Sequence, residues 1–429
     1  MSTVATPPAT GDAPRTRAPL ADLFLGGGRA RRIAWLVVGG LIVLSAVRAI
    51  SGENALTSSS TIAAALLLAV PIGLAGLGGL FSERSGVVNI GLEGMMILGT
   101  WGGGWAGYQW GWEAALLGGV LFGALGGLLH ALATVTFGVD HVISGVAINI
   151  LAAGIARFLS ELLYTDNPAG GGVTQSPALS SKPPTVSLPV LSSGPDLLGK
   201  VEQLHWFLIS DVAGVLRGVT HEVGVLTVLA VLLIPASYLL LWRTAFGLRL
   251  RSCGENPWAA DTLGVAVYRT KYIAVIISGA LAGMGGVFLV FIAGIYRENQ
   301  TGGRGFIGLA ALIFGNWRPG GLAAGASLFG YSDALQLRSP SAVVALLLLV
   351  AVLLAVLAVT QAMKGNVVQS AIAGVVAVAA LIGFLTIDAL PPGIVSFTPH
   401  LTTLLVLSLA AQRLRMPQAD GLVYRRGES

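Results

Sequence analysis

Long apolar runs, separated by short polar segments, fill most of the chain. A helix needs about 20 mostly apolar residues to cross a bilayer. A broken apolar region, 306–337, contains the turn-forming NWRPGG and predicts two helices or one re-entrant pair. The pattern therefore predicts an all-α integral membrane protein, a polytopic bundle of about 10–11 transmembrane helices with broken or re-entrant segments. Besides 306–337, the predicted spans are 33–52, 61–81, 94–111, 113–137, 141–164, 223–242, 272–295, 341–360, 367–387 and 398–412.

Lysine and arginine predict the orientation of this transmembrane domain, 33–412. They gather in the N-terminal tail 1–32, the loop 243–271 and the C-terminal tail 413–429, whereas the long segment 165–222 is poor in them. Basic flanks stay on the cytoplasmic side. We therefore expect both tails and 243–271 in the cytoplasm, with the N-terminal tail disordered. Segment 165–222 is then an external loop with an amphipathic part on the outer membrane surface.

Composition supports the membrane assignment and narrows the function. The chain is 54% hydrophobic and only 10% charged, against about 25% charged residues in a soluble domain. The net charge is +5, but the basic residues flank apolar runs and do not form one polar face, which argues against nucleic-acid binding. Cys253 is the single cysteine, so an internal disulfide is excluded.

Patterns typical of enzymes fail in this chain. The sequence GPDLLGKV approaches a phosphate-binding loop, but Val201 stands where Ser or Thr would ligate magnesium. The five histidines are scattered. We therefore expect no catalytic residue, metal or cofactor. Glycines spaced by four, at 119, 123 and 127, at 279 and 283, and at 321 and 325, predict close helix crossings instead.

Polar residues within the apolar regions are functional candidates, because they are costly in a bilayer. The stretch SERSGVVNIGLEG carries Ser85, Asn89 and Glu93 between two spans. It is either a solvated turn or an irregular segment that dips among helices beside a solute path. Asn149, in the middle of span 141–164, either faces that path or makes an interhelical hydrogen bond. On the same span, Arg157 and Glu161 are four residues apart and are expected to pair.

The loop 243–271 carries a short helix with clear end signals. Asn256 and Pro257 form a cap and a first-turn proline, and Gly264 is expected to stop the helix. A short capped helix in a basic loop suits docking to a soluble partner. The alternative is an ordinary connecting loop.

Three stretches resemble one transporter family. GLRLRSCGENPWAADTLGVAVYRTKYIAVIISGALAGMGG resembles the coupling loop of ABC importer permeases of the branched-chain amino acid, simple-sugar and nucleoside superfamily. SERSGVVNIGLEGMM resembles the signature of its nucleoside-type branch, and FTPHLTTLLVLSLAAQRLRMPQADGLVYRRGE resembles the last span and tail of that branch. Trp258 stands where many importers have Glu. Segment 341–390 lies outside the resemblance and is expected to be a two-helix insertion.

The resemblance implies a permease subunit without its own ATPase motif, in a bacterial plasma membrane, for a nucleoside or related sugar-bearing solute. The implied partners are a cytoplasmic ABC ATPase, a second homologous permease and an extracytoplasmic substrate-binding lipoprotein. The substrate-path candidates are Ser85, Asn89, Glu93 and Asn149. The ATPase-coupling residues would be Arg251, Gly254, Glu255, Asn256, Pro257, Ala259, Ala260 and Gly264.

Two alternatives remain open. A ribose-type sugar permease of the same superfamily would share the loop and most of the spans. A secondary transporter driven by an ion gradient would need carboxylates inside the membrane. Away from SERSGVVNIGLEG the spans offer essentially only Glu161, which is expected to pair with Arg157.

Overall fold

The computed structural model describes residues 29–387 and 414–427, and nearly all of its regular structure is helical. Two short strands, β1 (Thr185–Val186) and β2 (Val223–Gly224), pair antiparallel. The main helices are α2 (Arg29–Ser51), α3 (Ser59–Arg84), α4 (Leu92–Trp110), α5 (Trp112–Ala131), α6 (His141–Tyr164), α7 (Leu197–Glu202), α8 (Ile209–Gly218), α9 (Val225–Arg243), α10 (Ala245–Glu255), α11 (Pro257–Thr262), α12 (Val267–Ala293), α13 (Arg304–Phe314), α14 (Pro319–Arg338), α15 (Pro340–Met363) and α16 (Val367–Thr386).

Seven helices among the described residues are long and apolar enough to cross a membrane. This finding confirms an all-α, multi-pass membrane protein. The predicted spans 33–52 and 94–111 form α2 and α4, which fall below the same measure of length and hydropathy. Helix α2 begins at Arg29, inside the tail predicted to be disordered, and the predicted span 398–412 lies outside the described residues.

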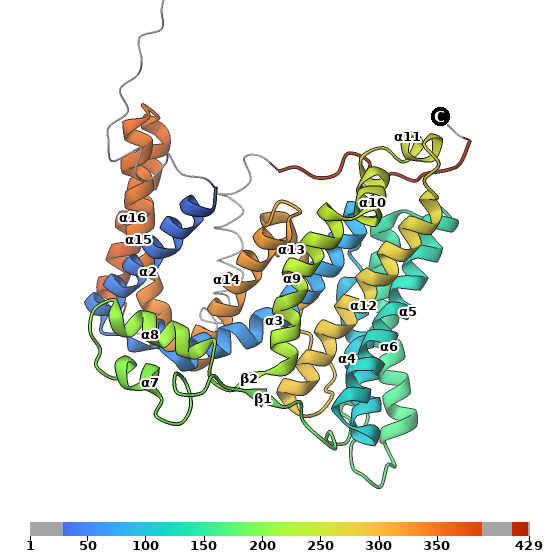
Figure 1. Cartoon of the computed structure of the whole chain (residues 1–429), viewed down its shortest axis with the longest axis horizontal. Helices are drawn as coiled ribbons and strands as arrows, with labels where there is room; N and C mark the ends of the chain where they lie inside the picture. The colour runs from blue at the N-terminus through green and yellow to red at the C-terminus, as the bar shows by residue number, and fades with distance from the viewer. Residues whose placement is uncertain (1–28, 388–413, 428–429) are drawn as a thin grey trace, which may run out of the picture.

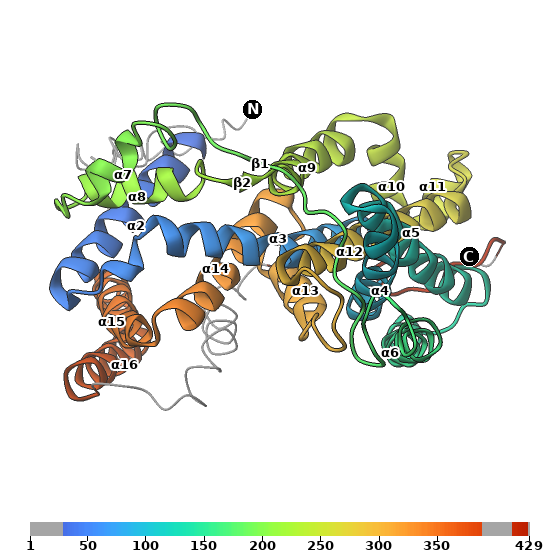
Figure 2. The same ribbon diagram turned by 90° about the horizontal axis from the view of Figure 1, so that it is seen from below.

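Helices α3 and α12 form the centre of the larger helix group. They are the most buried of the seven, with 78% and 67% of their most apolar windows inside the protein, against 11% for α16. Helices α4, α5, α13 and α14 pack around them. Figures 1 and 2 show this group on one side of the molecule, with α6 and α9 at its edges.

Glycines bring α5 and α12 into direct backbone contact. A Cβ atom on Gly123 would lie 2.3 Å from the carbonyl oxygen of Gly279, and one on Gly283 would lie 2.3 Å from that of Gly119. No other residue type fits such a crossing without moving the helices. The close approach predicted from the glycine spacing is confirmed for this pair.

A smaller helix group contains α2, α15 and α16, and α7 and α8 lie against it (Figure 2). Its buried contacts include Val47 of α2 and Ala345 of α15. The carboxylate of Asp211, on α8, binds the Arg48 guanidinium at 2.9 Å and the Thr57 hydroxyl at 2.5 Å. Segment 341–390 thus contains the two helices expected for it.

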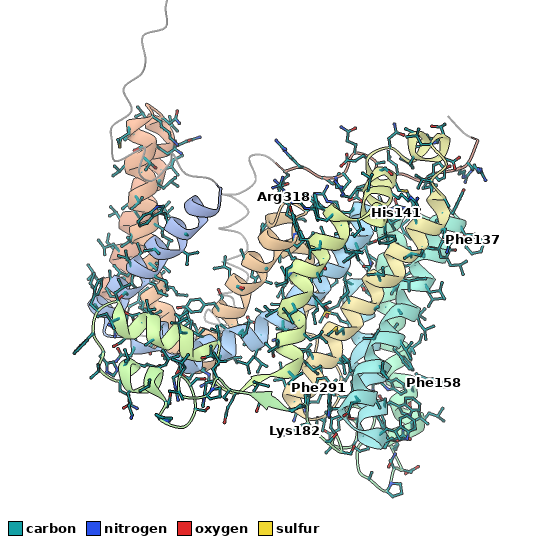
Figure 3. All side chains as sticks on the ribbon, viewed as in Figure 1. Phe137, His141, Phe158, Lys182, Phe291 and Arg318 are labelled. Atoms are coloured by element: carbon teal, nitrogen blue, oxygen red, sulfur yellow. The ribbon has the colours of Figure 1, made fainter. Side chains whose placement is uncertain are left out.

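The two ends of the bundle differ in what they carry. One end, called here the α11 end, holds α10, α11 and the C-terminal residues 414–427 (Figure 1). Figure 3 places Arg318 and His141 towards this end and Lys182 at the opposite one, the α7–α8 end. On α8 the polar Asp211 is buried while the apolar Ile209 is 56% exposed.

The broken region 306–337 consists of two helices, α13 and α14, as one of the two sequence interpretations has it. Between them, Asn316 and Trp317 both have positive φ angles, 54° and 51°. The tight turn folds α13 against α14, and a Cβ atom on Gly321 would lie 2.4 Å from the Gly315 oxygen.

Candidate functional site

The stretch that follows α3 is irregular and buried. Residues 85–91 form turns between α3 and α4, and the side chains of Ser85 and Asn89 are fully buried. The Ser85 hydroxyl donates to the Ser82 carbonyl at 2.6 Å, and the Ser82 hydroxyl donates to the Val87 carbonyl at 2.6 Å. These bonds satisfy backbone groups that no helix uses. The prediction of an irregular segment among helices is confirmed, and we call residues 85–91 the buried turn.

Two histidines clamp the buried turn at Val88. The Nε2 atom of His130 lies 3.0 Å from the Val88 carbonyl oxygen, and Nδ1 of His141 accepts from the Val88 amide at 3.3 Å. The other ring nitrogen of His130 contacts the Ser144 hydroxyl at 2.9 Å. Sequence analysis missed this role, because the partner peptide lies 42 and 53 residues away from the two rings.

Asn89 joins the buried turn to α12. Its side-chain amide donates to the Ser278 hydroxyl at 2.9 Å and contacts the sulfur of Met95 at 3.4 Å. Its Oδ1 atom is buried without a hydrogen-bond partner among the described residues. Asn89 therefore keeps one free acceptor inside the bundle.

Glu93 joins two helix starts. It lies in the first turn of α4, and its carboxylate accepts from the Gly303 amide at 2.9 Å and from the Gly305 amide at 2.7 Å. Gly303 is the N-terminal cap of α13. Amide groups at a helix start lack intrahelical acceptors and carry partial positive charge. The Glu93 carboxylate thus accepts from the first amides of α13 and lies at the positive end of the α4 dipole. We call this contact the helix junction.

The backbones at the helix junction approach closely. A Cβ atom on Gly305 would lie 2.6 Å from Cα of Glu93, so a larger residue there would displace the carboxylate. Gly303 has a φ of 80°, in the left-handed region that glycine adopts without strain. The sequence signal was the run of glycines before the apolar stretch at 306, but it does not identify Glu93 as the partner.

Asn149 caps α4 from a neighbouring helix. Its Oδ1 accepts from the Gly94 amide at 2.7 Å, and its Nδ2 donates to the Ile90 carbonyl at 3.1 Å. Of the two sequence interpretations, the interhelical hydrogen bond is therefore present. Asn149 and Glu93 together stabilise the starts of α4 and α13. That either residue contacts a solute stays a prediction.

The predicted pairing of Arg157 with Glu161 is wrong. Arg157 instead binds Glu298 at 3.1 Å, from the loop after α12. Glu161 is exposed. The spacing of four residues allowed the local pair, but the loop from α12 to α13 brings a second carboxylate within reach of the guanidinium.

The short helix predicted in the basic loop is confirmed as α11. The Asn256 side chain accepts from the Ala259 amide at 3.0 Å, and Pro257 occupies the first turn. The helix ends before Gly264, which has a φ of 82°. The polar cap, the proline and the glycine each fix one end of the helix from local sequence alone.

Residues before α11 contact the end of α3. A Cβ atom on Gly254 would lie 2.3 Å from the Arg84 carbonyl oxygen. The Arg84 guanidinium lies 3.8 Å from the Glu255 carboxylate. Arg251 donates to the Leu241 carbonyl at 2.9 Å. The loop that carries α11 thus lies directly against the residue that precedes the buried turn.

Part of α11 is exposed, although its Asp261 carboxylate lies 3.5 Å from the Arg426 guanidinium. Ala260 is 2% exposed, whereas Leu263, just after the helix, is 84% exposed. Ala259 and Asn256 are exposed too. A single exposed apolar side chain is common on protein surfaces, so the case for docking at α11 rests on the capped helix in a basic loop and not on Leu263 alone.

The family model described as branched-chain amino acid transport system, permease component, matches residues 61–357. The chain belongs to this family of ABC transporter permeases. The match includes the helix junction, the buried turn, α11 and most of α15, and it excludes all of α16 and 414–427. Segment 341–390 therefore lies only partly outside the family, and not wholly outside it as the sequence predicted.

Curated relatives agree with this assignment. The chain is 39% identical to the guanosine ABC transporter permease protein NupQ of Bacillus subtilis over 65% of this chain and 82% of the relative. It is 31% identical to the nucleoside ABC transporter permease protein NupC of Lactococcus lactis, over 84% and 94%. The putative glucose ABC transporter permease protein TsgC13 of Haloferax volcanii is 32% identical, over 82% and 93%. No solved structure matches the chain. The protein is thus a permease subunit of an ABC importer.

Proposed function

We propose that this permease forms one half of a path for a nucleoside and that a separate cytoplasmic ATPase drives it through α11. The observation that carries the coupling half of the proposal is α11 itself: a capped helix, apolar on its exposed side, whose loop contacts the end of α3. The substrate half rests on the relatives named for guanosine and nucleoside transport.

The polar groups of the buried turn and the start of α4 suit an uncharged, hydroxyl-rich solute. The Glu93 carboxylate accepts hydrogen bonds from the Gly303 and Gly305 amides at the start of α13. Asn89 retains a buried acceptor, and Ser85 and Asn149 add neutral polar groups nearby. A path lined by these four residues would offer hydrogen bonds without an unpaired charge.

This chain would move the solute, and a partner subunit would hydrolyse ATP. The chain's approach to a phosphate-binding loop, at Gly194–Val201, lacks the hydroxyl that would ligate magnesium, so ATP hydrolysis is assigned to the partner subunit. The α11 end would face the cytoplasm, as its arginines favour. The α7–α8 end would receive solute from an extracytoplasmic lipoprotein, and a second permease would complete the path.

A sugar is the second candidate substrate. The similarity to the putative glucose permease of Haloferax volcanii supports it, at 32% identity over most of both chains. An ion-coupled transporter has less support, because the Glu93 carboxylate is bound to α13 and Glu161 is exposed.

Uptake by the reconstituted importer tests the proposal. Vesicles containing both permeases, the ATPase and the lipoprotein should accumulate labelled guanosine when ATP is present on the ATPase side. Labelled ribose and glucose serve as competitors. Uptake of guanosine driven by an imposed ion gradient without ATP would contradict the proposal, and stronger uptake of either sugar would assign the sugar instead.

A further inference from the structure

The C-terminal residues 414–427 cross the α11 end of the bundle. Figure 1 shows them in dark red, running past α10 to α11. They lie outside the residues that the family model matches. Their first contact is the Arg415 amide, which donates to the Asn316 side chain at 2.7 Å, between α13 and α14. We call this segment the C-terminal strap.

The middle of the strap binds the loop before α11 through its backbone. The Ala419 amide donates to the Gly254 carbonyl at 2.8 Å, and the Gln418 amide lies 3.4 Å from the Glu255 carboxylate. Ala419 also reaches the buried turn, since a Cβ atom on Gly86 would lie 3.1 Å from the Ala419 oxygen. One strap residue therefore touches both the α11 loop and the turn that leads to the helix junction.

The end of the strap holds α11 through an aromatic cluster. The ring of Tyr424 is 5% exposed and meets the Trp258 ring of α11 edge-on, with centroids 5.7 Å apart. The Tyr268 ring, at the start of α12, lies 5.5 Å from the other side of Tyr424. Such aromatic contacts add to the stability that burial provides. Trp258, the residue that departs from the family's usual Glu, thus packs against this permease's own strap.

Asp420 lies between these two contacts and is close to the end of α3. Burial, and then repulsion from the Glu83 carboxylate, raise the pKa of Asp420 above its usual range. A raised pKa favours the neutral carboxyl, whose burial costs less free energy than the burial of a charge.

We propose that the strap joins α11 to the buried turn, with Tyr424 as the positioning residue that makes the two move as one body. This inference rests on the proposed function, in which an ATPase moves α11. The α11 loop is also held by the Arg84–Glu255 ion pair and by packing of Ala260 in a buried cluster. The strap adds Tyr424 to that cluster and bonds to the Gly254 carbonyl, so a displacement of α11 is transmitted to residues 85–91.

Cys253 provides a native probe of the strap, because it is the single cysteine of the chain. It is fully buried beneath Tyr424, in a cluster with Ala260 and Val267. Burial raises the pKa of the Cys253 thiol to about 11, which keeps the reactive thiolate scarce. Modification by a maleimide therefore reports release of the strap.

The experiment compares Tyr424→Ala with Leu422→Ala in the assembled importer with cysteine-free partners. Leu422 lies on the same strap but is 49% exposed, so it is the matched control. Tyr424→Ala should speed maleimide labelling of Cys253 about tenfold or more, because opening of the cover limits access. It should also lower the solute imported per ATP hydrolysed while the ATPase still binds. Tyr424→Phe, which keeps the ring, should restore both quantities.

Wild-type labelling adds a measurement that needs no variant. If strap and α11 move together, Cys253 stays equally protected with and without ATP. Faster wild-type labelling in ATP would overturn the inference, and so would a Tyr424→Ala importer with an unchanged ratio of solute to ATP. An importer in which wild type imports nothing on ATP would instead reject the proposed function, while the labelling comparison would still decide whether Tyr424 holds the strap.

Discussion

The helix junction and the α11 loop are both built around a helix start, but they treat it differently. At the junction, Glu93 and Asn149 come from other helices and satisfy the amides of α13 and α4 inside the bundle. In the loop, Asn256 caps its own helix, and Leu263 beside it is left in solvent. The first arrangement fixes the starts of α4 and α13 to neighbouring helices. The second leaves Ala259 and Leu263 exposed to solvent, while the C-terminal strap packs against Trp258 of the same helix.

We therefore expect the junction to determine the stability of the bundle and α11 to determine coupling to the proposed ATPase. A buried polar group costs free energy when its partner is lost, so changes at the junction should reduce stability first. An exposed helix face costs little to alter, so changes on α11 should reduce coupling with stability preserved. Variants of the two regions should therefore separate a loss of stability from a loss of coupling.

Glu93→Ala should have the largest effect. It removes the acceptor of two buried amides, at Gly303 and Gly305, and each hydrogen bond to a charged group contributes about 1.5–3 kcal/mol, so unfolding should become easier by about 3–6 kcal/mol. Denaturant unfolding of the purified permease measures this. Glu113→Ala is the control, since Glu113 also lies in a first helix turn but is exposed. Equal losses of unfolding free energy in Glu93→Ala and Glu113→Ala would show that Glu93 stabilises the protein no more than an exposed glutamate does.

Asn149→Ala should come next, with a loss of about 2–4 kcal/mol. The Gly94 amide and the Ile90 carbonyl would both lose their partner, in a site that is only half-buried, at about 1–2 kcal/mol each. Asn149→Asp keeps the acceptor and loses the donor, so its loss should be about half. If Asn149→Asp were as unstable as Asn149→Ala while transport stayed normal, the capping role would be rejected.

Gly254→Ala and Gly264→Ala compare the two ends of the α11 loop. The first places a methyl group 2.3 Å from the Arg84 oxygen, which should destabilise the loop by about 1–3 kcal/mol and slow transport. The second meets nothing within 4 Å and is disfavoured only by its φ of 82°, at about 1 kcal/mol. Transport by both variants at fixed ATPase concentration is the measurement. A stronger transport defect in Gly264→Ala than in Gly254→Ala would show that the critical contact lies at the exposed end of the loop and not between Gly254 and α3.

Leu263→Ser should leave stability within about 0.5 kcal/mol, because the side chain is already exposed. It should weaken binding of the ATPase, which titration of the reconstituted permease with the ATPase measures. Leu248→Ser, on exposed Leu248 of α10, is the control for a general loss of apolar surface. An unchanged ATPase affinity in Leu263→Ser would argue against docking at this face.

Local sequence was sufficient wherever both partners of a contact lie within one turn of a helix. The cap at Asn256 and the stop at Gly264 were predicted on this basis. For the close α5–α12 crossing, the glycine spacing predicted a face suited to close packing on each helix, but not which helices would meet. The α11 helix could be placed from eight residues because capping involves nearest neighbours.

The long-range contacts could not be predicted in the same way. Glu93 and Gly303 are 210 residues apart, and the sequence between them gives no sign that they meet. The same holds for Trp258 and Tyr424. For Arg157, the local rule selected Glu161, and the tertiary structure supplied Glu298 instead. A charged side chain accepts any suitable partner within reach, and the loop that brings Glu298 there is set by the packing of α12 and α13.

Hydrogen–deuterium exchange of the assembled importer, with and without ATP, tests the central comparison most directly. The account predicts that amides around the helix junction, at 92–95 and 303–306, keep the same protection in both states. Amides of the α11 loop, 255–264, and of the C-terminal strap, 414–427, should change protection together. A change at the junction with an unaltered α11 loop would contradict the account.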